Sequence, residues 1–251
     1  MSCDVANHYN RIATNYERMF GFVQARNDRY CKLIADTIHV DSFRSNSGRL
    51  LDIAGGTGSF TKKLSEQLGF SEYWVADSSC AMISLAKVNG ANTIICDMNK
   101  SQDLDKLTET GPFDMVVNRF GIHHCSNWPQ LFHYVHKMLT ENGIFILISR
   151  ERPTFHVPEQ LHRNFQPITN EDITELIAIS KQCGFKNAKC FPVRLEPFRI
   201  PRDEWVESLR GRIFSNMKSI SDAEIEQFIE DHCKAQEIVF EDEQIFFYFT
   251  N

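Results

Sequence analysis

The chain has 251 residues, of which 42% are hydrophobic and 24% are charged, and its formal net charge is −6. This composition is typical of a globular protein, and the acidic balance disfavours nucleic acid as the main partner because phosphate binding needs a basic face. No segment approaches the ~20 apolar residues of a membrane span, and the eight scattered cysteines include no Cys-x-x-Cys pair, so we expect a cytoplasmic protein with reduced thiols and no membrane contact.

Apolar runs alternate with helical patterns along the chain. They predict strands over 49–54, 73–77, 92–97, 113–118 and 143–149, and helices over 59–69, 79–90 and 127–139. Strands this apolar are covered on both faces, which indicates a mostly parallel sheet with helices on each side. Later patterns predict a helix, a strand, two helices and a last strand, over 169–184, 187–198, 202–215, 221–234 and 243–251. Without a linker or a repeat, we expect one α/β domain over 1–251.

The glycine-rich stretch LLDIAGGTGSF, residues 50–60, follows the first strand. A dinucleotide site needs a third glycine where Thr61 stands, and a triphosphate site needs a Gly-Lys-Ser/Thr that is absent. Asp52 is instead followed by small residues that let a ligand approach the backbone, and its carboxylate suits a cation such as an α-ammonium group. The loop therefore favours a nucleoside that carries positive charge, although an ordinary strand-to-helix turn is the alternative.

Two further acids stand at the ends of the next strands. Asp77 closes the second strand, where a carboxylate can accept both ribose hydroxyls, and Asp97 closes the third, where it can accept the amino hydrogens of an adenine. Ligands of an open α/β sheet bind over the carboxyl ends of the strands, so these acids and Asp52 share one rim. Each could be an ordinary strand-end acid, but three in succession indicate a nucleoside site.

The motifs LLDIAGGTG, VADSS, CDMN and FDMVVNRFGIHH resemble those of class I S-adenosylmethionine-dependent methyltransferases, over about residues 48–150. The resemblance implies a Rossmann-like, doubly wound sheet of seven strands with the last antiparallel, and S-adenosyl-L-methionine as the cofactor, with S-adenosyl-L-homocysteine as its product. It divides the domain into an N-terminal helical lid over 1–45, a cofactor-binding core over 46–150 and substrate-side helices and strands over 151–251. It implies these cofactor contacts: Asp52, Ala54, Gly55, Gly56, Gly58, Asp77, Ser78, Met82, Asp97, Met98, Asn118, Arg119 and Phe120.

Ala54 departs from the family pattern, which usually has glycine there, and we expect this small residue to be tolerated if its φ is negative. The stretch HYNRIATNYERM, residues 8–19, is similar to a Y-x-x-x-A-x-x-Y helix that covers the cofactor in many members. By this likeness Tyr9 and Tyr16 are candidates to touch the methionine carboxylate. The alternative is an amphipathic helix whose tyrosines only pack on the domain.

Methyl transfer needs an aligned nucleophile, and an amine or a phenol must also lose a proton. His123 and His124 follow the fourth strand, beside the place where the methyl group should project, so either is a candidate base or substrate-positioning group. Otherwise they support the loop. We expect no metal site, because the remaining histidines lack the spacing of metal ligands: His8, His133, His136, His156, His162 and His232.

The acceptor site is expected between the sixth and the last strand. Segment 191–217 mixes arginines with aromatic residues, and its W…R-G-R-x-F-S pattern is faintly similar to methyltransferases of the trans-aconitate type. An arginine there could pair with an acceptor carboxylate through its planar fork, although a solvated mixed-charge face is the alternative. The candidate acceptor contacts are Trp205, Arg210, Arg212 and Phe214.

These patterns predict methyl transfer from S-adenosylmethionine to the oxygen or nitrogen of a small molecule, with a carboxylate-bearing metabolite as one candidate. A tRNA or protein methyltransferase on the same fold is disfavoured by the acidic balance. The intact cofactor acids argue against a catalytically silent binding subunit, although a loss of acceptor binding alone would leave these motifs unchanged. Thr61 and Asp97 argue against a nicotinamide-dependent oxidoreductase. The acceptor's identity and the oligomeric state do not follow from these patterns.

Overall fold

The computed structural model describes residues 2–19, 23–38, 48–150 and 168–251. Its centre is a seven-stranded sheet in the order β3-β2-β1-β4-β5-β7-β6. Strands β1 to β5 are parallel, and β7 runs antiparallel to both β5 and β6, so the predicted fold class is confirmed. The strands are β1 Arg49–Ile53, β2 Glu72–Asp77, β3 Asn92–Ile95, β4 Phe113–Arg119, β5 Leu139–Arg150, β6 Asn187–Pro201 and β7 Glu237–Thr250.

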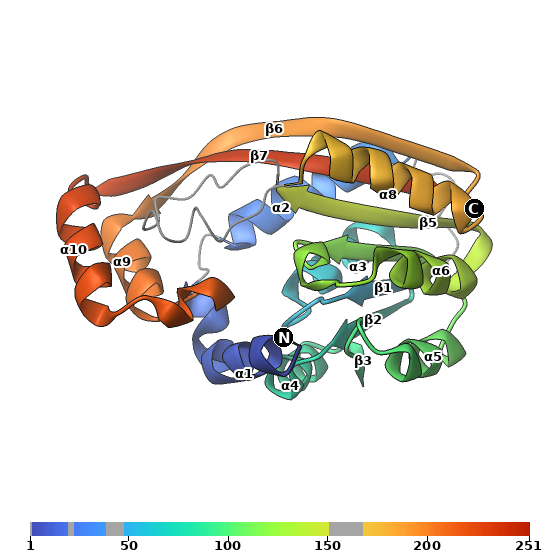
Figure 1. Ribbon diagram of the computed structural model, residues 1–251, viewed down its shortest axis with the longest axis horizontal. Coiled ribbons are helices and arrows are strands. Elements are labelled where there is room, and N and C mark those ends of the chain that lie inside the picture. The colour runs from blue at the N-terminus through green and yellow to red at the C-terminus, as the bar shows by residue number, and fades with distance from the viewer. Residues whose placement is uncertain (1, 20–22, 39–47, 151–167) are drawn as a thin grey trace.

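Helices cover both faces of the sheet (Figure 1). Helices α2 Val23–Thr37, α3 Ser59–Leu68 and α4 Cys80–Val88 pack on one face, and α5 Ser101–Glu109, α6 Trp128–Met138 and α8 Asn170–Gln182 pack on the other. Side chains of a strand alternate between the faces, so Leu50 and Leu51 enter different clusters of the core. Helix α5 was not predicted, because its polar sequence SQDLDKLTE buries only Leu104 and Leu107.

Strands β6 and β7 continue beyond the sheet to α9 Arg202–Arg210 and α10 Asp222–His232, at the left of Figure 1. This extension has its own apolar core around Trp205 and Phe240. Helix α9 ends at Arg210 rather than at residue 215, because Gly211 follows and Arg212 adopts a φ of 52°. Strand β7 begins at Glu237, six residues before the predicted start at 243, where it pairs with the far end of β6.

Helix α1 Ser2–Met19 lies against α4 and beside the extension (Figure 1). The side chain of Asn10 accepts hydrogen bonds from Ser79 Oγ at 2.7 Å and from the Ala81 amide at 3.1 Å, at the N-terminus of α4. Glu17 accepts from the hydroxyls of Thr57 and Ser59 in the loop after β1. These bonds fix α1 beside the carboxyl ends of β1 and β2.

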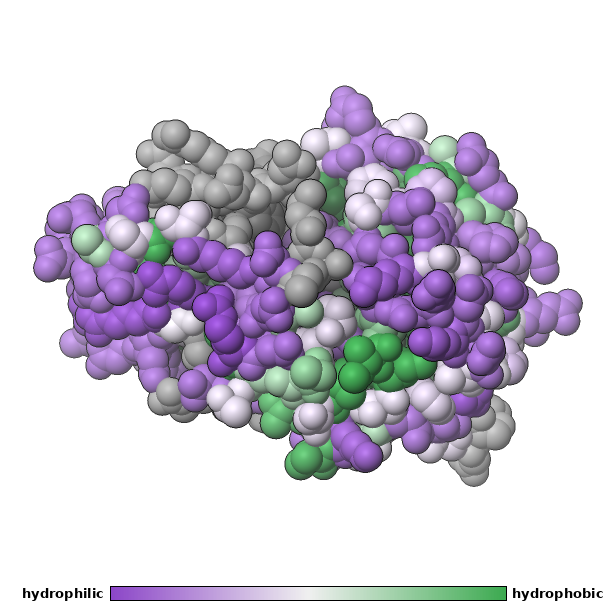
Figure 2. Space-filling view, turned by 60° about the horizontal axis from the view of Figure 1, so that its bottom comes forward, coloured by the Kyte–Doolittle hydropathy of each residue, from purple (hydrophilic) through white to green (hydrophobic). Residues whose placement is uncertain are grey.

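The face that carries α1 and α4 is mostly hydrophilic, with a band of hydrophobic residues in its lower half (Figure 2). Val88 and Ile95, at the ends of α4 and β3, are large apolar residues that the structure exposes. In the described ranges, no helix is long and apolar enough to cross a membrane. The proposed boundary at residues 45–46 lies outside the described residues, as does the start of the segment over 151–251.

Candidate active site

The loop between β1 and α3 is built from left-handed residues. Gly56 and Gly58 have φ values of 59° and 73°, which glycine adopts without a steric cost. A Cβ on Gly58 would lie 3.1 Å from Val75 Cγ2 and 3.3 Å from Ala86 Cβ, whereas a Cβ on Gly56 would meet nothing within 4 Å. Gly58 therefore lets α3 begin close to β2 and α4, and Gly56 leaves open space above its backbone.

Ala54 has a φ of 61°, so the condition of a negative φ, under which an alanine here is easily tolerated, is not met. The Ala54 amide donates to the Ala76 carbonyl at 2.7 Å, which holds the chain in the turn. The left-handed conformation costs an alanine roughly 1–2 kcal/mol. The preference of the family for glycine at this position has the same physical cause.

We expect Gly58→Ala to destabilise the fold by roughly 1–3 kcal/mol, through its left-handed backbone and the crowding against Val75 and Ala86. Gly69→Ala is the matched control, because Gly69 has a φ of 75° and a Cβ there would meet nothing within 4 Å. Urea unfolding of both variants separates the backbone cost from the crowding. Equal losses would contradict the packing role of Gly58.

Asp52 is buried at the end of β1, with 2% of its surface exposed. Its Oδ2 accepts a hydrogen bond from Thr61 Oγ1 at 2.6 Å, and its Oδ1 has no hydrogen-bond partner among the described residues. Burial raises the pKa of Asp52 to about 7, although the Thr61 hydroxyl and the Arg119 guanidinium oppose the shift. Thr61, which the sequence marked only as a missing glycine, thus orients the carboxylate.

Asp77 meets the glycine loop directly. Its Oδ2 accepts from the Gly56 amide at 3.0 Å and its Oδ1 accepts from the Ser79 amide at 2.8 Å. Burial raises the pKa of Asp77, and the hydrogen bonds from Ser79, Gly56 and the backbone of Ser78 oppose this. A carboxylate oxygen has two lone pairs, so each oxygen can still accept from a ligand hydroxyl.

Asp97 follows β3 and is 8% exposed, next to the buried Met98. Its Oδ1 accepts from the Asn99 amide at 3.1 Å, and its Oδ2 lies 3.7 Å from Lys100 Nζ. Because β3, β2 and β1 are neighbours in the sheet, the three acids lie along one edge, as predicted from the strand order. Met82, buried in α4, packs against Ile12 of α1.

At the end of β4, Asn118 is buried and bridges two loops. Its Nδ2 donates to the Ile53 carbonyl at 2.8 Å, and its Oδ1 accepts from the Gly121 amide at 3.2 Å. A Cβ on Gly121 would lie 2.7 Å from Ala54 Cβ, and Phe120 has a φ of 59°. The Asn118 amide therefore holds the loops after β1 and β4 together.

Arg119 ends β4 with its guanidinium enclosed by aromatic rings. The guanidinium carbon lies 4.0 Å from the Phe60 ring centroid, and Nη1 donates to Asn27 Oδ1 at 2.7 Å. Burial lowers the pKa of Arg119, and Arg26 lowers it further, while Asp52 opposes the shift. In the part of the chain that the structure describes, no carboxylate lies within ion-pair distance of Arg119.

The two predicted histidines lie in a 3-10 turn, Ile122–His124, with ring centroids 3.9 Å apart. His123 is exposed, whereas His124 is mostly enclosed, and in the described part of the chain its Nε2 has no hydrogen-bond partner. Burial lowers the pKa of His124 to about 4, so its ring is neutral at physiological pH. The Tyr9 ring is 6.3 Å from His124 and 6.3 Å from Tyr16, which places α1 beside this turn.

The four predicted acceptor contacts lie in the extension. Trp205 is fully buried, 4.9 Å from the Phe240 ring, and Phe214 packs against it. Arg210 donates twice to Glu226, each bond 2.7 Å long, and Arg212 donates to Asp222 at 2.7 Å. Both guanidiniums are therefore paired within the chain, as expected for the alternative of a mixed-charge surface.

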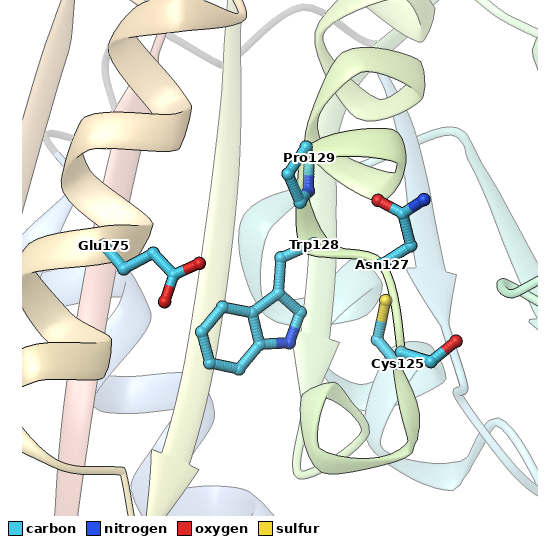
Figure 3. Close-up of a pocket in the computed structure, with 6 residues that line it drawn as sticks. Cys125, Asn127, Trp128, Pro129 and Glu175 are labelled. Atoms are coloured by element: carbon cyan, nitrogen blue, oxygen red, sulfur yellow. The ribbon is translucent and has the colours of Figure 1, made fainter.

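A pocket of about 320 Å³ lies between the start of α6 and helix α8 (Figure 3). Glu175 of α8 faces the Trp128 indole across it, and Cys125 and Asn127 lie on the α6 side. Asn127 is occupied as the cap of α6, and burial raises the pKa of the Cys125 thiol. The pocket lacks the strand-end acids and is not the candidate site. Among the described residues, which exclude His156 and His162, no group of three His, Cys, Asp or Glu could hold a metal ion.

A sheet of this order, with acids at the carboxyl ends of β1 to β3, defines a Rossmann-like nucleoside-binding protein. A family model described as a methyltransferase domain matches residues 22–186, more than half of the chain. The chain therefore belongs to this methyltransferase family, and its identification as a class I S-adenosylmethionine-dependent methyltransferase is confirmed.

The similarity to individual proteins is more distant. The chain is 26% identical over 155 residues to the ubiquinone/menaquinone biosynthesis C-methyltransferase UbiE of Coxiella burnetii, which is 60% of each protein. Phosphoethanolamine N-methyltransferase 2 of Haemonchus contortus, in complex with S-adenosyl-L-methionine, has a TM-score of 0.57 at 17% sequence identity. This match covers 96% of this chain and 57% of the Haemonchus contortus protein. A SAM-dependent methyltransferase of Thermotoga maritima has a TM-score of 0.55 at 15% sequence identity, and the match covers 98% of this chain and 99% of that protein. The chain thus spans about 60% of the curated relative, and the structural matches show the fold.

Proposed function

We propose that this protein transfers the methyl group of S-adenosylmethionine to an oxygen or nitrogen of a small molecule. The observation that carries the proposal is the unpartnered Oδ1 of Asp52, buried beside a glycine loop that leaves open space above Gly56. A buried carboxylate oxygen without a donor favours a cationic ligand group. The α-ammonium of S-adenosylmethionine is such a group.

The remaining cofactor contacts follow from the geometry of the edge. Asp77 retains lone pairs that could accept from the ribose hydroxyls, and we assign Asp97 and Met98, at the end of the next strand, to the adenine. The Arg119 guanidinium, next to Asp52 and without a carboxylate among the described residues, suits the methionine carboxylate, with Tyr9 or Tyr16 beside it. Bound in this way, the cofactor would supply a methyl group on a positively charged sulfur, which leaves as a thioether when an acceptor lone pair displaces it.

On the acceptor side, burial lowers the pKa of His124 to about 4, which makes its ring a weak base, so we assign it to orienting the O–H or N–H group of the acceptor rather than to removing its proton. His123 is exposed, which favours His124 for this role. The carboxylate-bearing acceptor receives no support from Arg210 and Arg212, because both already meet carboxylates of the chain. The proposal therefore leaves the acceptor's charge open.

The cofactor part can be tested by isothermal titration with S-adenosylhomocysteine. We expect saturable binding, and Asp77→Ala should weaken it by about 10–100-fold, because hydrogen bonds to a charged group contribute roughly 1.5–3 kcal/mol. Asp105→Ala on the exposed side of α5 is the control and should leave the affinity unchanged. No binding to the unmodified protein at high micromolar concentration would rule the proposed function out. The acceptor can be sought by incubating the protein with labelled S-adenosylmethionine and a cell extract.

A further inference from the structure

His8 is a buried histidine of α1, and its sequence context gave it no role. Only 1% of its surface is exposed, and among the described residues its ring nitrogens make no hydrogen bond of standard geometry, although the Ile213 backbone lies close enough for a weak one. Its ring lies 5.2 Å from the Tyr9 ring, which in turn lies 6.3 Å from His124. The backbone of Ile213 approaches His8 from the extension. His8 therefore lies where α1, the turn after β4 and the extension meet.

Three buried imidazole nitrogens make no hydrogen bond of standard geometry with the described residues: Nδ1 and Nε2 of His8 and Nε2 of His124. Burial lowers the pKa of each ring to about 4, so both are neutral at physiological pH. A neutral imidazole presents one N–H donor and one lone pair. An unmet buried polar group costs roughly 1–3 kcal/mol, so these rings gain from a ligand that both donates and accepts.

The charges around the rings select among ligands. Arg11 and Lys218 both lower the pKa of His8, so their positive charges act on this site, while the Ile213 backbone opposes them. A protonated amine would be repelled by these cations. A carboxylate would be attracted, but it only accepts hydrogen bonds and would leave the imidazole lone pairs unmet. A neutral hydroxyl donates and accepts, and it is not repelled.

We propose that His8 binds the methyl acceptor, and that His8 and His124 form a two-imidazole site which hydrogen-bonds a neutral hydroxyl of a phenol or an alcohol. The inference rests on the proposed function and narrows it to an acceptor that presents oxygen at this site. One ring accepts the hydroxyl hydrogen, and the N–H of the other donates to the hydroxyl oxygen. His8 thereby holds the acceptor under α1, beside the carboxyl end of β4.

The test uses the full chain saturated with S-adenosylhomocysteine, with 4-methylphenol as the probe and ¹⁵N-labelled histidine observed by NMR. We expect the probe to shift the ring-nitrogen resonances of His8 and His124. His8→Phe should weaken probe binding at least about tenfold, with an unchanged affinity for S-adenosylhomocysteine. Its folded stability should change little, because the removed nitrogens have only a weak contact with the Ile213 backbone among the described residues. His133→Phe, at an exposed position of α6, is the control.

Two comparisons sharpen the result. Benzylamine and benzoate should each bind at least about tenfold more weakly than 4-methylphenol. His8→Gln, which keeps a donor and an acceptor, should retain part of the affinity that His8→Phe loses. The proposal is overturned if 4-methylphenol at about 10 mM leaves both rings unshifted, or if His8→Phe binds it as the unmodified protein does. Failure of S-adenosylhomocysteine to bind would instead refute the proposed function.

Discussion

Asp242→Asn is expected to destabilise the protein by about 3–5 kcal/mol, because it removes the buried carboxylate that pairs with the Arg26 guanidinium. Asp242 of β7 is fully buried and Arg26 of α2 is 5% exposed, with Nη2 and Oδ1 2.7 Å apart. Tyr30 and Gln244 also donate to Oδ1, at 2.9 and 2.8 Å. The network joins α2 to β7, and Arg26 lies over the Phe120 ring beside the candidate site. Urea unfolding followed by circular dichroism measures the change.

Two controls separate the buried charge from a general sensitivity of the fold. Arg210→Ala removes an exposed ion pair with Glu226 and should leave the unfolding midpoint essentially unchanged. The double variant Arg26→Met with Asp242→Leu should recover most of the lost stability, because it removes both charges and keeps apolar volume. If the double variant is no more stable than Asp242→Asn, the loss of this buried ion pair is not the cause of the destabilisation.

The effect of Asp242 should depend on pH in a defined direction. Burial alone would raise the pKa of Asp242, but the Arg26 guanidinium and the hydrogen bonds from Gln244 and Tyr30 lower it below its ordinary value. A depressed carboxyl pKa stabilises the fold above the unfolded value of about 3.9, and this contribution is lost as the pH falls through the folded pKa. The difference between the unmodified protein and Asp242→Asn should therefore shrink below about pH 4.

The sheet was predictable from the sequence because its central strands are apolar on both faces and end in recognisable residues. Strand β5 shows the strength of this signal, since GIFILIS lies within Leu139–Arg150. Helix α5 was missed because two leucines in a polar stretch make a weak periodic signal. The end of α9 was missed because the φ of Arg212 depends on contacts with Ile220 and Asp222, which lie beyond the helix.

The candidate site was predictable only where its residues follow strand ends. Asp52, Asp77 and Asp97 were identified from their positions after apolar runs, which the parallel sheet then places along one edge. Thr61 and Glu17 were not, because their hydrogen bonds to Asp52 and to the loop depend on how α3 and α1 pack. His8 has no local pattern at all. Burial and the absence of a hydrogen-bond partner are tertiary properties, and they alone distinguish it from a surface histidine.

Asp52→Asn is expected to weaken the binding of S-adenosylhomocysteine by about 10–100-fold at pH 8. The reason is that a hydrogen bond to a charged group contributes roughly 1.5–3 kcal/mol. Since burial raises the pKa of Asp52 to about 7, the ligand-free carboxyl is largely protonated below that pH. Pairing with an α-ammonium group requires the ionised form, so affinity should rise with pH from about 6 to 8, by at most tenfold per unit. Titrations at several pH values measure the profile, which should be flat in Asp52→Asn.

Ionisation of Asp52 should lower the stability of the ligand-free fold, although the same ionisation strengthens ligand binding. Because its folded pKa lies above the unfolded value of about 3.9, the folded state holds the extra proton between these values, and stability falls as the pH rises through them. Asp52→Asn removes this cost of at most ~1.4 kcal/mol per pH unit, so the ligand-free variant should be more stable than the unmodified protein at pH 8. The charge of Asp77 also raises the pKa of Asp52, and that of Arg119 lowers it. Asp36→Asn, at an exposed position, is the control for the loss of a negative charge alone. A variant that binds weakly and is also less stable at pH 8 would contradict a ligand-binding role and indicate a structural one.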